Sequence, residues 1–132
     1  MHSLQTPLTP TAQGLPAESS RSATSASVFL PREQIAACAS FRDAVCLAWD
    51  QRAIRGMTQR TLAETLEVPA SHLSNMLNRD PVDRHGKARQ DLPAKLIADF
   101  ERVIGNRAVS QYLARMAMLT LMEEVITAQR GL

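Results

Sequence analysis

The sequence predicts an all-α protein: a compact bundle of about five helices with a long C-terminal helix, preceded by a disordered N-terminal tail. Three observations lead to this prediction. Apolar residues recur at helical spacing between residues 31 and 130, and Gly, Pro or Asn residues separate the periodic segments. Aromatic residues make up 4% of the chain and hydrophobic residues 45%, so aliphatic side chains must fill a single core. We therefore expect a tail over residues 1–30 and one domain over residues 31–130.

The tail prediction rests on composition. Residues 1–28 are rich in Ser, Thr, Pro and Ala, and their only charged residues are Glu18 and Arg21. A segment of this kind cannot bury enough apolar surface to offset the entropy of folding. We expect a flexible tail or an over-extended start of the chain, and its residues indicate no particular partner.

Two helices are expected next, over residues 32–38 and 41–55. Ser40 can cap the N-terminus of the second helix, and Gly56 can end it. An apolar stripe runs along successive turns of this second helix, which predicts that it supports the segment that follows. Trp49 is expected to anchor the core or the edge of the domain.

Residues 57–79 predict two short helices joined by a tight corner. Thr58 can cap the first helix, and Met57 before it can pack on an apolar residue one turn later. The inward residues of this first helix are Leu62, Ala63 and Leu66. Ala63 is small enough to let the second helix approach closely. Val68 fills the corner from the inside, and Pro69 starts the second helix because its fixed φ suits a first turn.

The second helix of this pair presents a polar outward face. Its inward residues are Leu73, Met76 and Leu77. The outward face is uncharged and rich in hydrogen-bonding groups, which suits the edges of DNA bases; Asn, for example, can pair bidentately with adenine. The candidate base-reading residues are Ser71, His72, Ser74, Asn75 and Asn78.

Residues 80–90 form a polar segment with Pro and Gly, so a loop is expected there. A charged loop by itself is usually only solvated. Beside a reading helix, contact with DNA phosphates becomes the favoured interpretation. The candidate phosphate-binding residues are Thr58, Gln59 and Arg60 at the start of the first helix of the pair, and Arg79, Arg84, Lys87 and Arg89 around the loop.

The C-terminal part predicts a helix over residues 92–104, a break at Gly105 and Asn106, and a last helix from about residue 107 or 108 to residue 129. The last helix is apolar over more than one face. One face can close the core, and the surplus predicts a second buried surface, most simply in a homodimer. The candidate dimer-interface residues are Leu113, Met116, Leu119, Met122 and Ile126.

Residues 57–79 resemble the helix-turn-helix of phage repressor and Cro-type regulators. Ala63, Val68, Leu73 and Met76 stand where that family keeps its small and apolar framework residues. One departure is Glu67, because the family usually has Gly at the corner, where the backbone tends to adopt a positive φ. A non-Gly residue there costs about 1 kcal/mol, which tertiary packing can absorb.

The resemblance implies a compact helix-turn-helix bundle that binds double-stranded DNA as a dimer and regulates transcription. Repression is the default expectation, because occupying an operator requires only binding. Residues 91–115 are also, more loosely, similar to the C-terminal part of phage lysogeny-type regulators, which implies a prophage or mobile-element origin.

Catalysis is not expected. Cys38, Cys46 and the His residues show neither metal-ligand spacing nor a Cys-His nucleophile pattern, and no Gly-rich phosphate loop or Gly-x-Ser-x-Gly occurs. We therefore expect no metal, no cofactor and no small-molecule substrate. No apolar run is long enough for a membrane, and no secretory signal is visible, so we expect a bacterial cytoplasmic protein that associates with the nucleoid when bound.

A competing class remains open: a protein-interaction module, such as an antitoxin or a phage accessory protein, whose helix pair binds a protein. The formal net charge of +2 and the pI near 8.8 are too slight to identify a nucleic-acid binder. Composition therefore does not decide between the two classes.

Overall fold

The computed structural model describes residues 28–131, which form six α-helices and one short 3-10 helix. In chain order these are α2 (Arg32–Ala36), α3 (Phe41–Asp50), α4 (Gln59–Leu66), α5 (Ala70–Met76), η2 (Ala94–Leu96), α6 (Ile97–Ile104) and α7 (Ala108–Arg130). Residues 28–131 contain isolated bridge pairings but no strand. The all-α prediction with a long C-terminal helix is confirmed, whereas the predicted disorder of residues 1–27 lies outside the described part of the chain.

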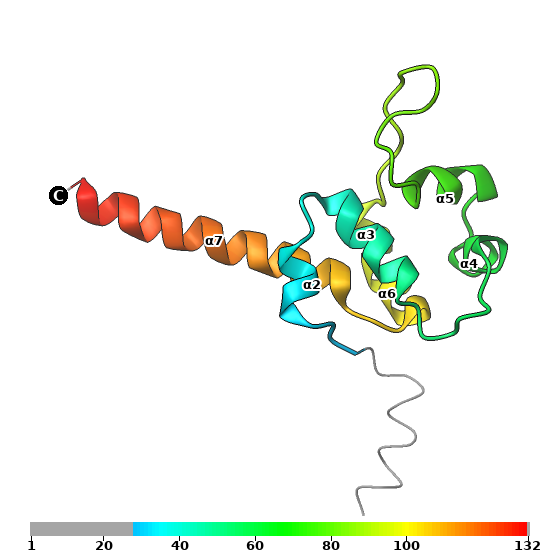
Figure 1. The fold of residues 1–132 in the computed structure, drawn as a ribbon, viewed down its shortest axis with the longest axis horizontal. Helices are drawn as coiled ribbons and strands as arrows, with labels where there is room; N and C mark the ends of the chain where they lie inside the picture. The colour runs from blue at the N-terminus through cyan, green and yellow to red at the C-terminus, as the bar shows by residue number, and fades with distance from the viewer. Residues whose placement is uncertain (1–27, 132) are drawn as a thin grey trace, which may run out of the picture.

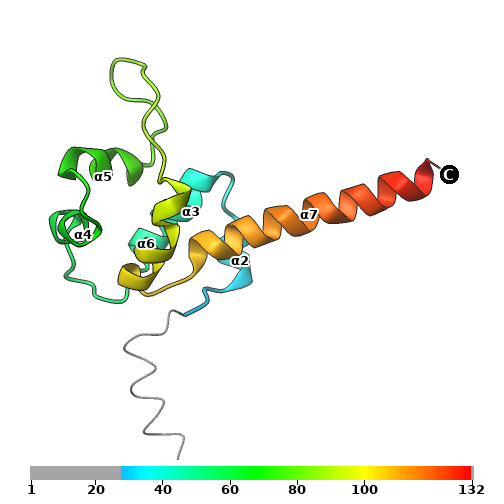
Figure 2. The ribbon, with the colours of Figure 1, turned by 180° about the vertical axis from the view of Figure 1, so that it is seen from behind.

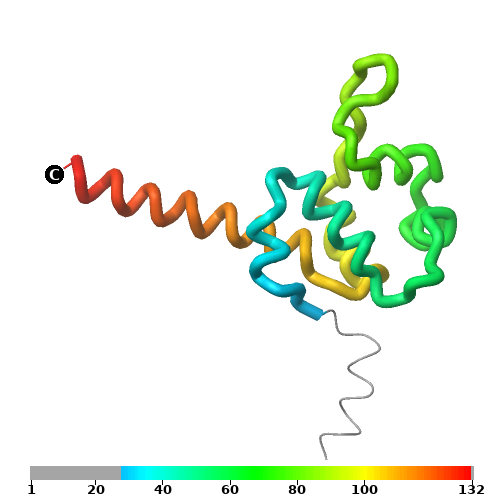
Figure 3. The backbone as a smooth tube through the Cα atoms, in the orientation of Figure 1, coloured from blue at the N-terminus to red at the C-terminus, as the bar shows by residue number. Residues whose placement is uncertain are grey.

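The helices form a body from which α7 extends (Figure 1). In this body α3 packs against both α6 and α7, and α4 packs against α5. The pair α4–α5 lies at the end of the molecule opposite the free end of α7, as both ribbon views show (Figure 2). The segment between α5 and η2 leaves the body as a projecting loop, which the tube makes easy to follow (Figure 3).

A single core joins these helices. Its largest fully buried apolar side chains come from α3, α4, α5, α6 and α7, and they are Val45, Leu62, Leu73, Phe100, Ile104 and Val109. Trp49 is half-buried and packs against this cluster, as the sequence predicted. The α4–α5 pair therefore belongs to the same core as the rest of the body.

Asn106 links the end of α3 to the start of α7. Its side chain is fully buried; Nδ2 donates to the carbonyl oxygens of Ala48 at 3.0 Å and Gln51 at 3.3 Å, and Oδ1 accepts from the amide of Ala108 at 3.1 Å. The predicted extension of α3 to residue 55 is wrong, because α3 ends at Asp50. Asn106 binds the carbonyl groups that a continuing helix would use for its own hydrogen bonds.

Gly105 ends α6 with φ +91°, which confirms the predicted break. A Cβ atom at this position would lie 2.8 Å from Cβ of Ala53. Both the backbone conformation and the space therefore require glycine. The predicted helix over residues 92–104 is shorter than expected, since its first turn is the 3-10 helix η2.

The described chain starts at Val28, so residues 28–30, which the predicted tail over residues 1–30 included, belong to the folded body. The amide of Val28 donates to the carbonyl of Gly105 at 3.1 Å, and the amide of Arg107 donates to the carbonyl of Val28 at 2.9 Å. The side chain of Gln111 binds both the amide and the carbonyl of Leu30, at 2.9 and 3.0 Å. The sequence could not predict these contacts with the start of α7, because residues 28–30 belong to a segment without apolar periodicity.

The residues predicted to form a dimer face all lie on the exposed surface of α7. Leu113, Met116, Leu119, Met122 and Ile126 are all exposed. Leu113 and Met122 are nine residues apart, which places them on opposite sides of a helix with 3.6 residues per turn. Leu113 adjoins Met116, three residues along the helix, so the predicted set spans about half of the circumference of α7. Among residues 28–131, no helix has both the length and the apolarity that crossing a bilayer requires.

We predict that Gly105→Ala lowers the free energy of unfolding by about 2 kcal/mol, because the alanine is strained at positive φ and meets Ala53. Chemical denaturation measures this loss. The matched control is Gly56→Ala, since a Cβ at Gly56 has no neighbour within 4 Å. Equal losses in the two variants would contradict the interpretation.

Candidate nucleic-acid interface

Helix α4 starts as its sequence predicts. Oγ1 of Thr58 accepts a hydrogen bond from the amide of Thr61 at 3.2 Å, so Thr58 is the N-cap. Met57 and Leu62 both lie in the buried core, as the predicted staple requires. Thr58 thus has a structural role, and its hydroxyl, which the sequence predicts to bind phosphate, accepts the capping hydrogen bond.

The corner between α4 and α5 has the predicted backbone geometry. Glu67 has φ 58° and ψ 44° and is the only non-glycine residue at positive φ among residues 28–131. The amide of Val68 donates to the carbonyl of Ala63 at 3.0 Å, which closes the end of α4. Ala63 is 2% exposed, and Val68 packs against the core. The corner therefore fixes the direction in which α5 leaves α4.

Helix α5 turns its polar residues outward. Leu73, Met76 and Leu77 are buried, whereas Ser71, His72 and Ser74 are exposed. The side chains of these three exposed residues form no hydrogen bond or ion pair with any residue in 28–131. Their donors and acceptors are therefore free to meet a partner.

The two asparagines on α5 and just after it are engaged within the protein. Oδ1 of Asn75 accepts from Nη1 of Arg89 at 2.8 Å, and Oδ1 of Asn78 accepts from the amide of Asp80 at 2.9 Å. Both residues are half-buried. Bidentate pairing of Asn75 with adenine needs its Oδ1 atom, so the hydrogen bond from Arg89 to this atom would have to break first. The predicted reading set is thus free only at Ser71, His72 and Ser74.

Residues 80–90 fold as a narrow hairpin-like loop. Val82 and Ala88 form an antiparallel bridge, and the amide of Arg89 donates to the carbonyl of Pro81 at 2.9 Å. At the tip, Oδ1 of Asp83 accepts from the amides of His85 and Lys87 at 2.8 and 2.9 Å. The loop prediction is confirmed, but this loop has its own internal hydrogen bonds.

The tip carries positive charge outward. The backbone amides of Lys87 and His85 hold the pKa of the Asp83 carboxyl below its ordinary value, so Asp83 stays ionised and turned toward the backbone. The side chains of Arg84 and Lys87 are exposed and make no hydrogen bond or ion pair within residues 28–131. These two cations carry positive charge at the tip of the loop that no ion pair engages.

Two other predicted phosphate-binding arginines have partners. Arg79 forms an ion pair with Asp50 on α3. The guanidinium of Arg89 lies between Oδ1 of Asn75 and the carbonyl of Val82. Gln59 and Arg60 are exposed at the start of α4. Arg60 lies 3.9 Å from Glu64 in an exposed pair that contributes little.

Arg42 on α3 is the residue that the sequence interpretation missed. Its side chain is 6% exposed. Nη1 donates to the carbonyls of Asn75 at 2.7 Å and Asn78 at 2.8 Å, and Nη2 donates to the carbonyl of Gln90 at 3.0 Å and to Oδ1 of Asp91 at 2.9 Å. One guanidinium therefore holds the C-terminal end of α5 and the returning segment of the loop, at Gln90 and Asp91, together.

A signal for Arg42 was present in the sequence. It precedes the buried residues Val45 and Cys46 by three and four positions, so it lies within the apolar stripe of α3. A charged residue in such a stripe is seldom buried unless it has partners. The pattern indicated a buried cation but could not indicate which carbonyl groups it binds.

The charges of this region balance. Residues 57–91 contain equal numbers of basic and acidic residues. Of these acids, Asp91 pairs with Arg42 on α3 and Asp83 accepts from backbone amides, whereas Arg79, one of the bases, pairs with Asp50 on α3. Free positive charge is therefore local, at the loop tip and at the start of α4.

Within residues 28–131, no three His, Cys, Asp or Glu side chains gather as a metal site would need. Burial raises the pKa of both the Cys38 and Cys46 thiols. The Cys46 thiol donates to the carbonyl of Leu77 at 3.3 Å, which is a packing role beside the end of α5.

Comparisons of the chain with protein-family models, with curated proteins and with solved structures find no match.

We predict that Glu67→Gly raises the melting temperature, because glycine removes a backbone strain of about 1 kcal/mol at positive φ. Glu67→Ala is the matched control, since it removes the carboxylate but keeps the Cβ atom, and it should not stabilise. Thermal unfolding measured by circular dichroism compares the three proteins. A gain that is equal in both variants would assign the effect to charge instead of backbone.

We predict that Arg42→Met lowers the free energy of unfolding by about 3 kcal/mol or more, since buried carbonyl groups lose a charged donor. It should also speed amide exchange in residues 80–90 more than in α7. Arg60→Ala, an exposed arginine on α4, is the control and should change stability little. A loss below about 1 kcal/mol for Arg42→Met would show that α5 is held by other contacts.

Proposed function

We propose that this chain binds double-stranded DNA sequence-specifically, with α5 in the major groove, and that it regulates transcription. The observation that carries the proposal is the outward face of α5, where Ser71, His72 and Ser74 have no partner in residues 28–131. Their hydroxyl and imidazole groups are exposed on a helix that the α4 corner and Arg42 hold in place. A major groove admits a helix that presents such groups to base edges.

The loop supports the second part of the contact. It starts directly after α5 and projects from the body beside the C-terminal end of that helix (Figure 1). Arg84 and Lys87 at its tip have free charges, which suit phosphate oxygens next to the groove. Gln59 and Arg60 can serve the same purpose from the N-terminal end of α4, where backbone amides also favour phosphate.

The proposal gives Asn75 a role other than the predicted reading of a base. Its Oδ1 holds Arg89, and Arg89 in turn binds the carbonyl of Val82 in the loop. Asn75 is thus a positioning residue that ties the reading helix to the loop. Ser71, His72 and Ser74 carry the sequence preference.

We propose repression over activation because repression requires fewer contacts. Occupying an operator is sufficient for repression, whereas activation needs a further contact with the transcription machinery. We therefore propose a repressor of the phage or mobile-element type that acts in the bacterial cytoplasm on the nucleoid. This step rests on the resemblance of residues 57–79 to phage regulators and on the looser similarity of residues 91–115 to phage lysogeny-type regulators.

The test starts with the full chain and a pool of random duplexes. Enrichment of a sequence motif is the expected result, and the affinity for the enriched duplex is then measured over a range of salt concentrations. His72→Ala and Ser74→Ala should each reduce discrimination at one base position by about 1 to 3 kcal/mol. The salt slope of these two variants should stay as in the parent chain.

Variants of the loop cations distinguish phosphate contact from base reading. Arg84→Ala combined with Lys87→Ala should weaken binding to all duplexes alike and reduce the salt slope by about two. Arg130→Ala, an exposed arginine at the far end of α7, removes a charge away from the interface and should leave the slope unchanged. Absence of binding at every salt concentration would overturn the proposal in favour of a protein-interaction module.

A further inference from the structure

The outer part of α7 has no cover in this structure. Every residue from 113 to 130 is exposed, and the helix stands away from the body in both ribbon views (Figures 1 and 2). Its large apolar side chains are 40% to 59% exposed, and they are Leu113, Met116, Met118, Leu119, Leu121, Met122, Val125 and Ile126. Most of the stability of a helix in a protein comes from packing of its apolar face, and an exposed apolar surface of this kind marks an interaction site.

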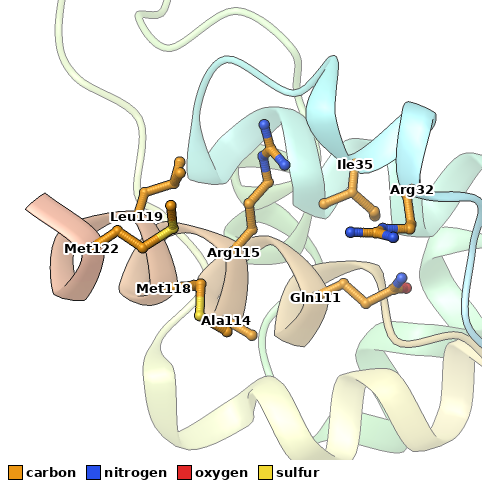
Figure 4. Close-up of a pocket in the computed structure, with 8 residues that line it drawn as sticks. All are labelled: Arg32, Ile35, Gln111, Ala114, Arg115, Met118, Leu119 and Met122. Carbon is orange, nitrogen blue, oxygen red and sulfur yellow. The ribbon is translucent and has the colours of Figure 1, made fainter.

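A groove between α2 and α7 continues onto this surface. It has a volume of about 420 Å³ and is lined by Arg32 and Ile35 of α2 and by Met118, Leu119 and Met122 of α7, among others. In Figure 4 the two α2 side chains lie beside the first turns of α7, and Leu119 and Met122 continue along the helix away from them. The groove is therefore the inner end of a longer apolar track.

The borders of this groove are basic. Arg32 and Arg115 both line it, and neither forms an ion pair with any residue in 28–131. An occupant that combines an apolar face with a carboxylate would match it. The outer part of α7 has this composition, since Glu123 lies between Met122 and Ile126 on its surface and has no ion pair within the described chain.

The α7 sequence is symmetric in chemistry about Leu119. Met116 and Met122 lie three residues to either side of it, and Tyr112 and Ile126 lie seven residues to either side. The four-residue positions carry opposite charges, Arg115 before Leu119 and Glu123 after it. In an antiparallel pair centred on Leu119, each residue meets its counterpart from the other copy: Met116 meets Met122, Tyr112 meets Ile126, and Arg115 lies level with Glu123.

We propose that two copies of this chain pair through α7 in antiparallel orientation, with the outer part of each α7 in the groove between α2 and α7 of the other. A parallel pair would place Arg115 opposite Arg115 and Glu123 opposite Glu123, and like charges in register are unfavourable. The antiparallel pair also keeps the two bodies at opposite ends. This inference uses only α2 and α7 and does not depend on DNA binding.

The test is a charge exchange, followed by sedimentation equilibrium of the full chain without DNA. The parent chain should be dimeric. Arg115→Glu and Glu123→Arg, made singly, should each raise the dimer dissociation constant by about tenfold or more, because each places like charges level with one another twice. The combined variant should return the constant to within about threefold of the parent.

Controls separate the pairing from general effects. Glu124→Arg makes the same charge change one position away, on the side of α7 turned from Leu119, and should leave the dissociation constant unchanged. Leu119→Asp should abolish the dimer while circular dichroism still shows a folded body. A monomeric parent chain at about 100 μM, or a combined variant no tighter than the single ones, would overturn the proposal.

Discussion

The guanidinium of Arg42 is the contact that the candidate interface depends on. Helix α5 has seven residues, and the last carbonyl groups of a helix have no partner within the helix itself. Arg42 supplies donors for these groups from α3, and it binds the end of the returning loop with its other nitrogen. A buried cation at the C-terminal end of a helix is also favoured by the helix dipole. The outward face of α5 and the loop therefore keep one relative orientation, although only Leu73, Met76 and Leu77 fix α5 in the core.

A second set of contacts fixes the body to which Arg42 belongs. Asn106 ends α3 and starts α7 with one buried amide, and Glu101 binds both the amide and the hydroxyl of Ser110 at 2.7 Å in the first turn of α7. These polar groups are buried but satisfied, which makes the crossing of α3, α6 and α7 specific. The direction of α7 away from the body is thus set at its first turn. The surface that α7 presents to a second copy follows from that direction.

The sequence predicted the features that depend on neighbouring residues along the chain. The caps at Ser40 and Thr58, the break at Gly105 and the positive φ at Glu67 each depend on a few neighbouring residues, and all are confirmed. It did not predict contacts between distant residues. Arg42 binds groups 33 to 49 positions away, and Asn75 meets Arg89 only because the loop folds back. These contacts removed Asn75, Arg79 and Arg89 from the set of free side chains, and no periodicity could have indicated that.

The two proposals together restrict the spacing of the DNA half-sites. Ala108 and Leu119 are eleven residues apart, so in a pair centred on Leu119 the two α7 helices start about 33 Å from each other at 1.5 Å per residue. Helices α4 and α5 lie farther out, beyond the start of α7 (Figure 1). The two reading helices are therefore separated by more than about one turn of DNA, which is 34 Å. An operator with half-sites on consecutive turns would fit α5 in the groove but not the α7 pair, so operator spacing bears on both proposals at once.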